Sequence, residues 1–222
     1  MSSKQLVKLQ VRPNYVDEVY RVLLDAISDG SLAPGTRITQ EEVAEQLNVS
    51  RSPVLQAMQL LKKNGLLQDA EGRGVMVAPL DINQIRHLYE IRSVLEVLAA
   101  RLAAERKEVI DRDLIVKGRQ IAQSNIVRAM IDADEAFHKA IYKASGNPLI
   151  ALTAEVHWAH LRRVMGALLQ SEDQRMSVWD EHEKLADAIE TGDVKIAVSV
   201  AEEHMESARV KLLSGLETLL NA

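Results

Sequence analysis

The spacing of apolar residues predicts helices along most of the 222-residue chain. Between residues 15 and 28, apolar side chains recur every three or four positions, and the pattern stops before a glycine. This periodicity is typical of a helix that buries one face. We expect a second, short helix after Thr39, because Thr39 can cap it and Glu41 and Glu42 follow in its first turn.

Residues 50–65 form the most clearly bounded of these helices. Ser50 can accept hydrogen bonds from the free amides of the first turn, and Gly65 can adopt the left-handed conformation that ends a helix. The face opposite the apolar stripe carries side chains that can reach phosphates and base edges in a DNA major groove: Arg51, Ser52, Gln56 and Gln59. Residues 68–77 then read as strand, turn and strand. This order of elements is typical of a winged helix-turn-helix.

From residue 81 onward the pattern is helical. Pro79 ends the last strand and Asp81 can cap the next helix, so we place a domain boundary there. The expected helices cover residues 82–106, about 111–125, 126–144, 149–170, 173–190 and 193–220. The sequence therefore predicts a mainly α protein. Its two parts are a winged helix-turn-helix with a small β-hairpin wing in residues 1–80 and an all-α antiparallel helical bundle in residues 81–222.

Composition excludes several classes of protein. Apolar residues make up 47% of the chain, which is normal for a soluble globular protein. No run of about 18 apolar residues indicates a membrane span, and the N-terminus lacks the apolar core of a secretion signal. The chain has no cysteine, so neither disulfides nor thiolate metal sites are expected. We therefore expect a cytoplasmic protein without a membrane partner.

Net charge alone does not favour DNA binding. The chain has a formal net charge of -5, and this acidity lies in the second part, because positive and negative side chains balance in residues 1–80. Attraction to phosphates would have to come from a local cluster of basic side chains. The cluster expected in residues 1–80 contains Arg37, Arg51, Lys62, Lys63 and Arg73.

The second part contains residues suited to a metal. Asp134 and His138 are four positions apart, which places them on one helix face. An aspartate hydrogen-bonded to a core histidine would show the same spacing. His182 and His204 can point into the same bundle interior, and imidazoles with one carboxylate suit zinc, nickel or manganese. His157 and His160 also share a face, but we expect a partly exposed pair there.

Both parts resemble one family of bacterial regulators. Pro34-Gly35, Ser50-Arg51-Ser52-Pro53-Val54 and Gly72-Arg73-Gly74 are similar to motifs in the DNA-binding domain of the GntR family. Residues 81–222 resemble the FCD effector-binding domain of that family, through "YEIRSVLEVLAARLAA", "DADEAFHKAIYKASGNPLI" and "HEKLADAIETGD". The chain departs from the family pattern at Leu55 and Gln56, where an arginine and a glutamate are usual. This departure affects the expected affinity or preference for DNA.

The resemblance implies a homodimeric, ligand-responsive transcription regulator that binds a palindromic double-stranded DNA operator. It also implies a divalent transition metal (zinc, nickel or manganese) that helps to bind a small carboxylate effector. The implied DNA contacts are Arg37, Thr39, Arg51, Ser52, Gln56, Arg73 and Gly74. The implied metal ligands are Asp134, His138, His182 and His204, and the implied effector-binding residues are Arg92 and Arg162.

Several alternatives stay open at this stage. Arg92 can instead form an ion pair with Glu96, four residues on. Met130, Met165, Trp158 and Trp179 are expected to be packing residues rather than ligand contacts. A metalloenzyme would need a general base beside the metal, and the neighbouring Glu135 should point elsewhere, so we do not expect an enzyme. A helical interaction protein whose DNA-binding domain is degenerate is the remaining alternative.

Overall fold

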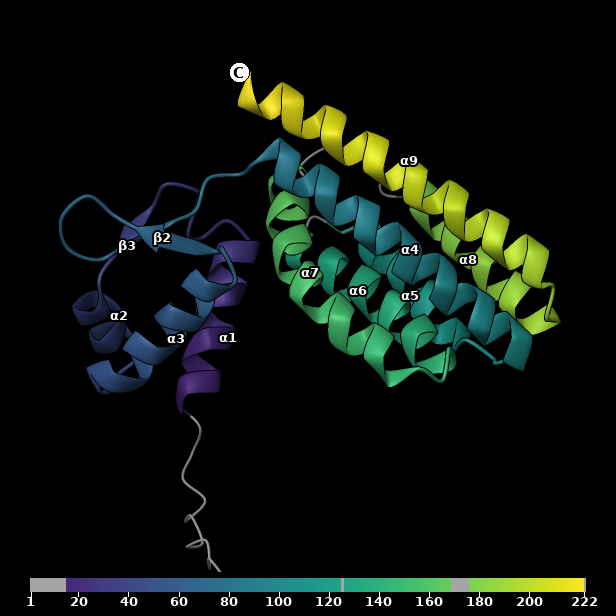
Figure 1. Ribbon diagram of the computed structural model, residues 1–222, viewed down its shortest axis with the longest axis horizontal. Helices are drawn as coiled ribbons and strands as arrows, with labels where there is room; N and C mark the ends of the chain where they lie inside the picture. Colours follow the sequence, from purple (N-terminus) through teal and green to yellow (C-terminus); the bar gives the residue numbers. More distant parts are fainter. Residues whose placement is uncertain (1–14, 125, 169–175, 222) are drawn as a thin grey trace, which may run out of the picture.

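The computed structural model describes residues 15–124, 126–168 and 176–221. The first fourteen residues of the predicted domain 1–80 lie outside the described residues, as do residue 125 and the facing ends of the predicted helices 149–170 and 173–190. The described chain forms a small N-terminal part and a larger helical bundle, each with its own hydrophobic core (Figure 1). The predicted fold class, a winged helix-turn-helix followed by an all-α bundle, is confirmed.

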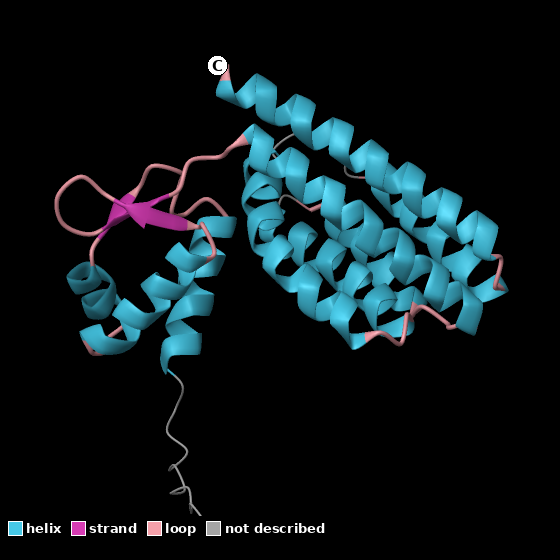
Figure 2. Ribbon diagram, in the orientation of Figure 1, coloured by secondary structure: helices cyan, strands magenta, loops and turns pink. Residues whose placement is uncertain are grey.

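The N-terminal part contains three helices and a three-stranded antiparallel sheet (Figure 2). Its elements are α1 (Tyr15–Ser28), β1 (Arg37–Ile38), α2 (Gln40–Gln46), α3 (Arg51–Lys63), β2 (Leu67–Asp69) and β3 (Val75–Val77). The predicted hairpin corresponds to β2 and β3. The first strand, β1, was not predicted, and it pairs with β3 so that Arg37 lies opposite Met76.

Local sequence explains how the helices of this part begin. The Thr39 hydroxyl accepts a hydrogen bond from the Glu42 amide at 3.3 Å, and the Glu42 carboxylate accepts one from the Thr39 amide at 2.8 Å, which forms the predicted capping box. Ser50 precedes α3, but its side chain makes no capping hydrogen bond within the described chain. A reason is that the third helical residue is Pro53, which lacks one of the two amide donors that such a cap uses.

The bundle consists of six helices in the described residues, as the sequence pattern predicts. They are α4 (Ile82–Arg106), α5 (Arg112–Ala122), α6 (Val127–Ala144), α7 (Pro148–Leu168), α8 (Ser177–Thr191) and α9 (Val194–Leu220). The side chain of Asp81 caps α4 by accepting from the Asn83 amide at 2.8 Å. The two longest helices, α4 and α9, lie side by side along the bundle (Figure 1). No helix of the described residues is both long and apolar enough to cross a bilayer.

Helix α7 joins the two parts. It packs against α1, and its residue Ala159 is buried in the hydrophobic core of the N-terminal part. The Arg163 guanidinium donates a hydrogen bond to the Ala78 carbonyl just before α4. The ring of His160 would contact a side chain at Gly65, and it is 7% exposed. The prediction of a partly exposed histidine pair is therefore wrong for His160, because packing between the two parts buries it.

Candidate metal centre and DNA-binding surface

Three helices of the bundle bring three histidines together. His138 comes from α6, His182 from α8 and His204 from α9, and all three are buried. Each offers one ring nitrogen, and these nitrogens lie within 4.8 Å of one another. The ring centroids are 5.2 Å apart for His138 and His182, and 4.9 Å apart for His182 and His204. The histidines that the sequence singles out therefore form one compact cluster.

Two carboxylates orient two of these rings through contacts at their Nδ1 atoms. The Nδ1 atom of His138 lies 3.0 Å from Glu96 Oε2, and the Nδ1 atom of His204 lies 2.7 Å from Glu181 Oε2. A carboxylate at Nδ1 holds the proton there, which leaves Nε2 with a free lone pair. This carboxylate–histidine arrangement is common behind metal ligands. Sequence reasoning missed Glu96 and Glu181 in this role, because both partners are distant along the chain.

His182 lacks a hydrogen-bond partner within the described chain. It is fully buried, and neither of its ring nitrogens has a hydrogen-bond partner among the described residues. Burial lowers its pKa well below the usual value, so the ring is neutral and can donate a lone pair. The nearest carboxylate is Asp134, whose Oδ1 lies 3.5 Å from His182 Nε2 and 4.0 Å from His138 Nε2. Buried polar atoms normally have partners, and a metal bound by these four side chains would supply one. The residues present fit zinc or a similar transition metal.

Arg92 lies beside this cluster. Its side chain is buried, and Nε lies 3.1 Å from Glu96 Oε1, so the alternative ion pair does form. The guanidinium also stacks 4.6 Å from the centre of the Trp158 ring. Its Nη2 atom, however, has no hydrogen-bond partner in the described chain. Arg92 can therefore keep its ion pair with Glu96 and still bind a carboxylate.

Glu96 is ionised although it is buried. Burial raises its pKa, but the neighbouring His138 and Arg92 outweigh this effect, and the pKa of Glu96 falls to about 2. The Tyr142 hydroxyl also donates a hydrogen bond to this carboxylate. Glu96 thus compensates the charge of Arg92 while it orients His138.

A cavity of about 590 Å³ opens beside the histidine cluster. Arg92, Asp134, His138 and His204 line it, as does the charged pair of Glu181 and Lys211. The lining also includes apolar residues of α6, α7 and α8: Met130, Met165, Leu168, Val178 and Trp179. We expected Met130, Met165 and Trp179 to serve packing, but they also form cavity walls. Helical periodicity marks these residues as buried and cannot show which of them border a space.

Arg162 is held away from this cavity. Its guanidinium forms ion pairs of 2.6 Å with Asp132 and of 2.6 Å with Glu135. It is not among the described residues that line the histidine cavity. Glu135 therefore points away from the histidines, as the helix geometry predicts.

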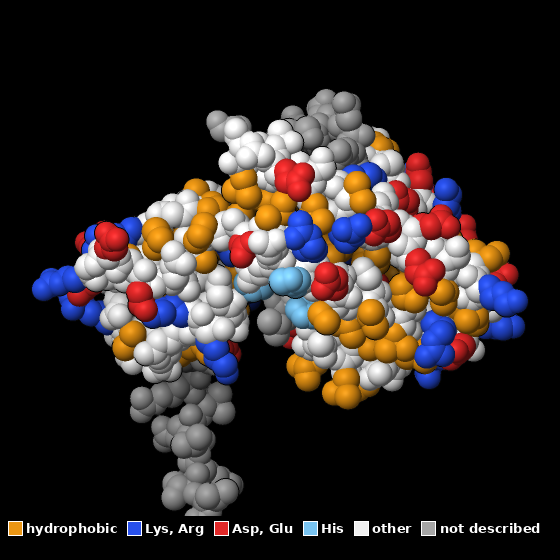
Figure 3. Space-filling model, turned by 45° about the horizontal axis from the view of Figure 1, so that its top comes forward, with side chains coloured by type: hydrophobic (Ala, Val, Ile, Leu, Met, Phe, Trp, Pro, Cys, Tyr) orange, Lys and Arg blue, Asp and Glu red, His pale blue; other side chains and the backbone are white. Residues whose placement is uncertain are grey.

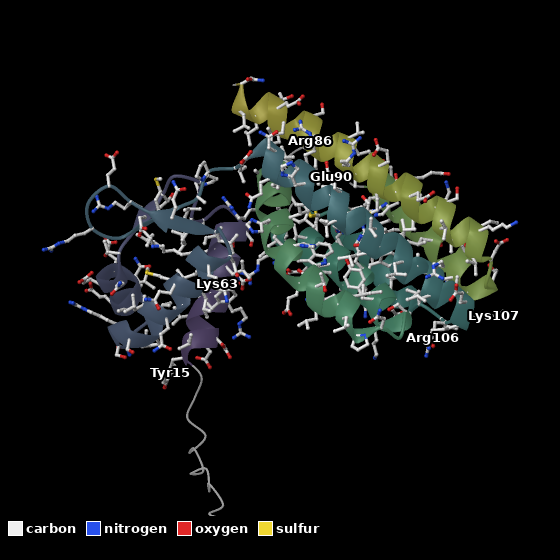
Figure 4. All side chains as sticks on the ribbon, viewed as in Figure 1. Tyr15, Lys63, Arg86, Glu90, Arg106 and Lys107 are labelled. Atoms are coloured by element: carbon white, nitrogen blue, oxygen red, sulfur yellow. The ribbon has the colours of Figure 1, made fainter. Side chains whose placement is uncertain are left out.

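The candidate DNA-contacting residues of α3 lie at its N-terminal end. Lys63 at the other end of α3 faces the bundle in Figure 4, so the N-terminal end is directed away from it. Arg51 is 68% exposed in its side chain and lies 3.0 Å from Glu41 of α2. Gln56 is exposed, and its Nε2 atom lies 3.5 Å from the Ser52 hydroxyl. These side chains are accessible to a partner as large as DNA.

The wing adds basic side chains to the N-terminal part. The Arg37 Nε atom donates a 2.7 Å hydrogen bond to the Arg73 carbonyl, which ties β1 to the loop between β2 and β3. Arg37 and Arg73 are both exposed. The space-filling view shows Lys and Arg side chains at the end of the N-terminal part that points away from the bundle, with acidic side chains among them (Figure 3). Arg37 and Arg73 thus lie together in the wing, whereas Arg51 and Lys62 pair with Glu41 and Asp69.

Gly74 shapes the wing, and Gly74→Ala is expected to destabilise it. Gly74 has φ +92°, and a Cβ there would lie 2.5 Å from the Ile38 carbonyl oxygen. Both the backbone conformation and the contact disfavour alanine, at a cost of about 1–3 kcal/mol. Urea unfolding followed by circular dichroism would measure it. Gly72→Ala is the control, because Gly72 has φ +89° but a Cβ there would meet no atom closer than 3.6 Å. Equal losses in both variants would contradict the role of the Ile38 contact.

Two family models match the chain. The model described as "Bacterial regulatory proteins, gntR family" matches residues 15–77, and the FCD domain model matches residues 87–207, more than half of the chain. The chain is 28% identical to the HTH-type transcriptional regulator LutR of Bacillus subtilis, over 85% of this chain and 96% of LutR. It is 29% identical to the HTH-type regulator YdhC of the same species, over 63% of this chain and 65% of YdhC.

A solved structure has the same fold. The structure of McbR/YncC from Escherichia coli superposes with a TM-score of 0.79 at 24% sequence identity, and the match covers 91% of this chain and 98% of that one. LutR, YdhC and the matched gntR family are transcriptional regulators rather than enzymes. The chain therefore belongs to the GntR family of bacterial regulatory proteins, and it is a DNA-binding transcriptional regulator with an FCD domain.

Proposed function

We propose that this regulator acts as a homodimer in the cytoplasm and binds a palindromic operator, and that a small organic acid bound beside a metal in the bundle controls it. The observation that carries this proposal is the buried His182, whose ring nitrogens lack hydrogen-bond partners in the described chain, together with Arg92, which lines the cavity and whose Nη2 also lacks one. A metal would bind one nitrogen of His182, and a carboxylate would accept from Arg92 Nη2.

In this proposal Asp134, His138, His182 and His204 hold the metal. The metal supplies a Lewis-acidic centre that attracts a carboxylate oxygen. Arg92 binds the carboxylate through Nη2, and Glu96 keeps the guanidinium in place at 3.1 Å. Arg162 has no part in this site, because Asp132 and Glu135 already neutralise it.

Helix α7 couples the proposed acid-binding site to the DNA-binding part, because it contacts both. Its residue Trp158 contacts Arg92 and lies 5.5 Å, ring centre to ring centre, from His138. The next residue, Ala159, is packed into the core of the DNA-binding part, and His160 follows at the same junction. A ligand that shifts Arg92 or His138 would therefore bias the position of the DNA-binding part through α7.

A dimer follows from the DNA geometry. One α3 can read one half-site, whereas a palindromic operator requires two copies held at a fixed spacing. Occupation of the bundle by the acid would then alter that spacing or its stability. The direct test measures operator affinity of the metal-loaded protein at fixed salt, with and without small carboxylic acids, on DNA selected from random duplexes. Unchanged affinity with every acid would overturn the ligand-responsive part of the proposal.

Arg51→Ala is expected to weaken operator binding by about 1–3 kcal/mol, because Arg51 is exposed at the N-terminal end of α3. Fluorescence anisotropy with labelled operator measures this loss. Arg101→Ala is the matched control, since Arg101 is an exposed arginine on α4 that pairs with Glu105 at 2.7 Å. If the parent protein binds no duplex, the degenerate alternative suggested by Leu55 and Gln56 replaces the proposal. If Arg51→Ala binds like the parent, another residue reads the operator.

A further inference from the structure

The cavity beside the histidines continues along α9. His204 lies at its metal end, and Ala208 and Gly215 line it further toward the C-terminal end of α9. At a rise of 1.5 Å per residue, the stretch of α9 from His204 to Gly215 is about 16 Å long. The volume of about 590 Å³ lies within the range of pockets that enclose drug-sized ligands. A two- or three-carbon acid would leave much of this space unfilled.

The chemistry of the walls changes along this length. The metal-ligating side chains and the buried Arg92 lie together in this lining, and the two other charged residues, Glu181 and Lys211, pair with each other at 3.6 Å. Met130 lies two turns before His138 on α6, which places it away from His138. The apolar walls contributed by the other helices are Ala122, Met165, Leu168, Val178, Trp179, Ala208 and Leu212. The polar lining residues of this part of α9 are Lys211, Ser214 and Thr218. Hydroxyl or carboxylate groups placed against the apolar walls would lose hydration without compensation.

Small residues of α9 line the cavity. A Cβ at Gly215 would lie 3.1 Å from both terminal methyl carbons of Leu168, so glycine lets Leu168 pack closely against α9 at that point. Ala208 is partly buried and presents a single methyl group one turn from His204. Met130 and Met165 are flexible side chains that can adapt to an apolar ligand.

The charges indicate one carboxylate rather than several. Two cationic side chains line the cavity in the described part of the chain, Arg92 and Lys211. Lys211 is paired with Glu181 at 3.6 Å. Arg92 keeps one unpartnered nitrogen, Nη2, although the residue is 3% exposed. One buried free donor group beside a metal site matches one carboxylate.

We propose that the acid is a monocarboxylic acid with a medium-length apolar tail. Its carboxylate lies at Arg92 and the histidines, and its tail lies along α9 past Ala208 toward Gly215. The inference rests on the proposed function, because it assigns a ligand class to the same site. Ala208 and Gly215 then set the length of tail that the regulator accepts.

A chain-length series tests this assignment on the full-length, zinc-loaded protein. Acetate, butanoate, hexanoate, octanoate and citrate are titrated while the tryptophan fluorescence is followed, which comes from the cavity wall residue Trp179 and from Trp158 beside Arg92. We expect affinity to rise by about fourfold per added methylene, the factor that corresponds to burying one such group. Calorimetry of octanoate binding should also show a negative heat-capacity change.

Ala208→Leu separates the tail channel from the carboxylate site. The larger side chain fills the channel next to His204, so octanoate should bind no more tightly than butanoate, while acetate affinity stays unchanged. Glu202→Leu is the matched control on the exposed surface of α9 and should retain the full chain-length dependence.

The outcomes distinguish the two proposals. If short acids bind but longer tails give no gain, or if citrate binds more tightly than octanoate, the tail assignment is wrong and the proposed function stands. If no acid binds to the metal-loaded protein, the proposed effector site itself is wrong, and the tail assignment falls with it. If Ala208→Leu binds octanoate like the parent, the tail lies elsewhere than along α9.

Discussion

The double variant His138→Ala/His182→Ala is expected to lose transition-metal binding altogether. The parent protein should carry about one metal ion per chain, because three imidazoles and one carboxylate are enough to hold zinc, and expansion to five ligands leaves a position for the acid. The variant keeps Asp134 and His204, which are too few ligands to hold a metal through purification. Elemental analysis of tag-free protein after dialysis measures the metal content directly.

The control for this experiment is His157→Ala. His157 is a half-buried histidine of the bundle that is not part of the three-histidine cluster found among the described residues. Its loss should leave the metal content unchanged. A parent protein that takes up no zinc, nickel or manganese would show that Asp134 and the histidines form a polar core cluster. Loss of metal in His157→Ala would place the site elsewhere.

Metal binding should also raise the stability of the parent. A ligand that binds only the folded state adds about 4 kcal/mol when its concentration is a thousand times its dissociation constant. Zinc should therefore raise the unfolding temperature of the parent and leave that of the double variant unchanged. The physical reason for this gain in stability lies in His182. A buried ring nitrogen without a hydrogen-bond partner costs free energy, and a bound metal recovers that free energy at the nitrogen it binds.

Local signals in the sequence predict most element boundaries. Asp81, Gly65 and Gly192 mark helix ends whose causes lie within a few residues, namely a capping carboxylate and a left-handed backbone. β1 was missed because two residues are too short for any pattern, and only pairing with β3 across the chain makes them a strand. The predicted Ser50 cap is absent, and Pro53 at the third helical position lacks one of the amide donors that such a cap uses.

The clustering of the histidines was predictable from the sequence, whereas the surroundings of the cluster were not. Spacing on one helix suggested Asp134 and His138, and the bundle topology suggested that the other histidines face them. The partners Glu96 and Glu181 depend on the rotation of α4 and α8 about their axes, which apolar periodicity fixes only approximately. The engagement of Arg162 by two acids of α6 depends on side-chain packing between helices in the same way.

Glu96→Ala is expected to destabilise the bundle by about 3–5 kcal/mol, because it leaves Arg92 as a buried charge without its counterion. Both side chains of this pair are 4% exposed. The same helix provides a matched control, Glu105→Ala, which breaks a pair of identical spacing between Arg101 and Glu105. Those side chains are 44% and 45% exposed, so the loss should be within about 1 kcal/mol. Urea unfolding with a chelator present excludes any contribution from a bound metal.

A second variant tests whether the buried pair of Arg92 and Glu96 serves stability or ligand binding. Arg92→Met/Glu96→Leu replaces the pair by apolar side chains, and such replacements are often neutral or stabilising. We expect it to recover most of the stability that Glu96→Ala loses, although Tyr142 and His138 lose a hydrogen-bond partner. The double variant should nevertheless fail to bind carboxylic acids, because Arg92 Nη2 is gone. Stability without acid binding, in a variant that still carries its metal, would mean that Arg92 is kept for the ligand. Equal losses for Glu96→Ala and Glu105→Ala would instead show that water reaches Arg92 once Glu96 is removed.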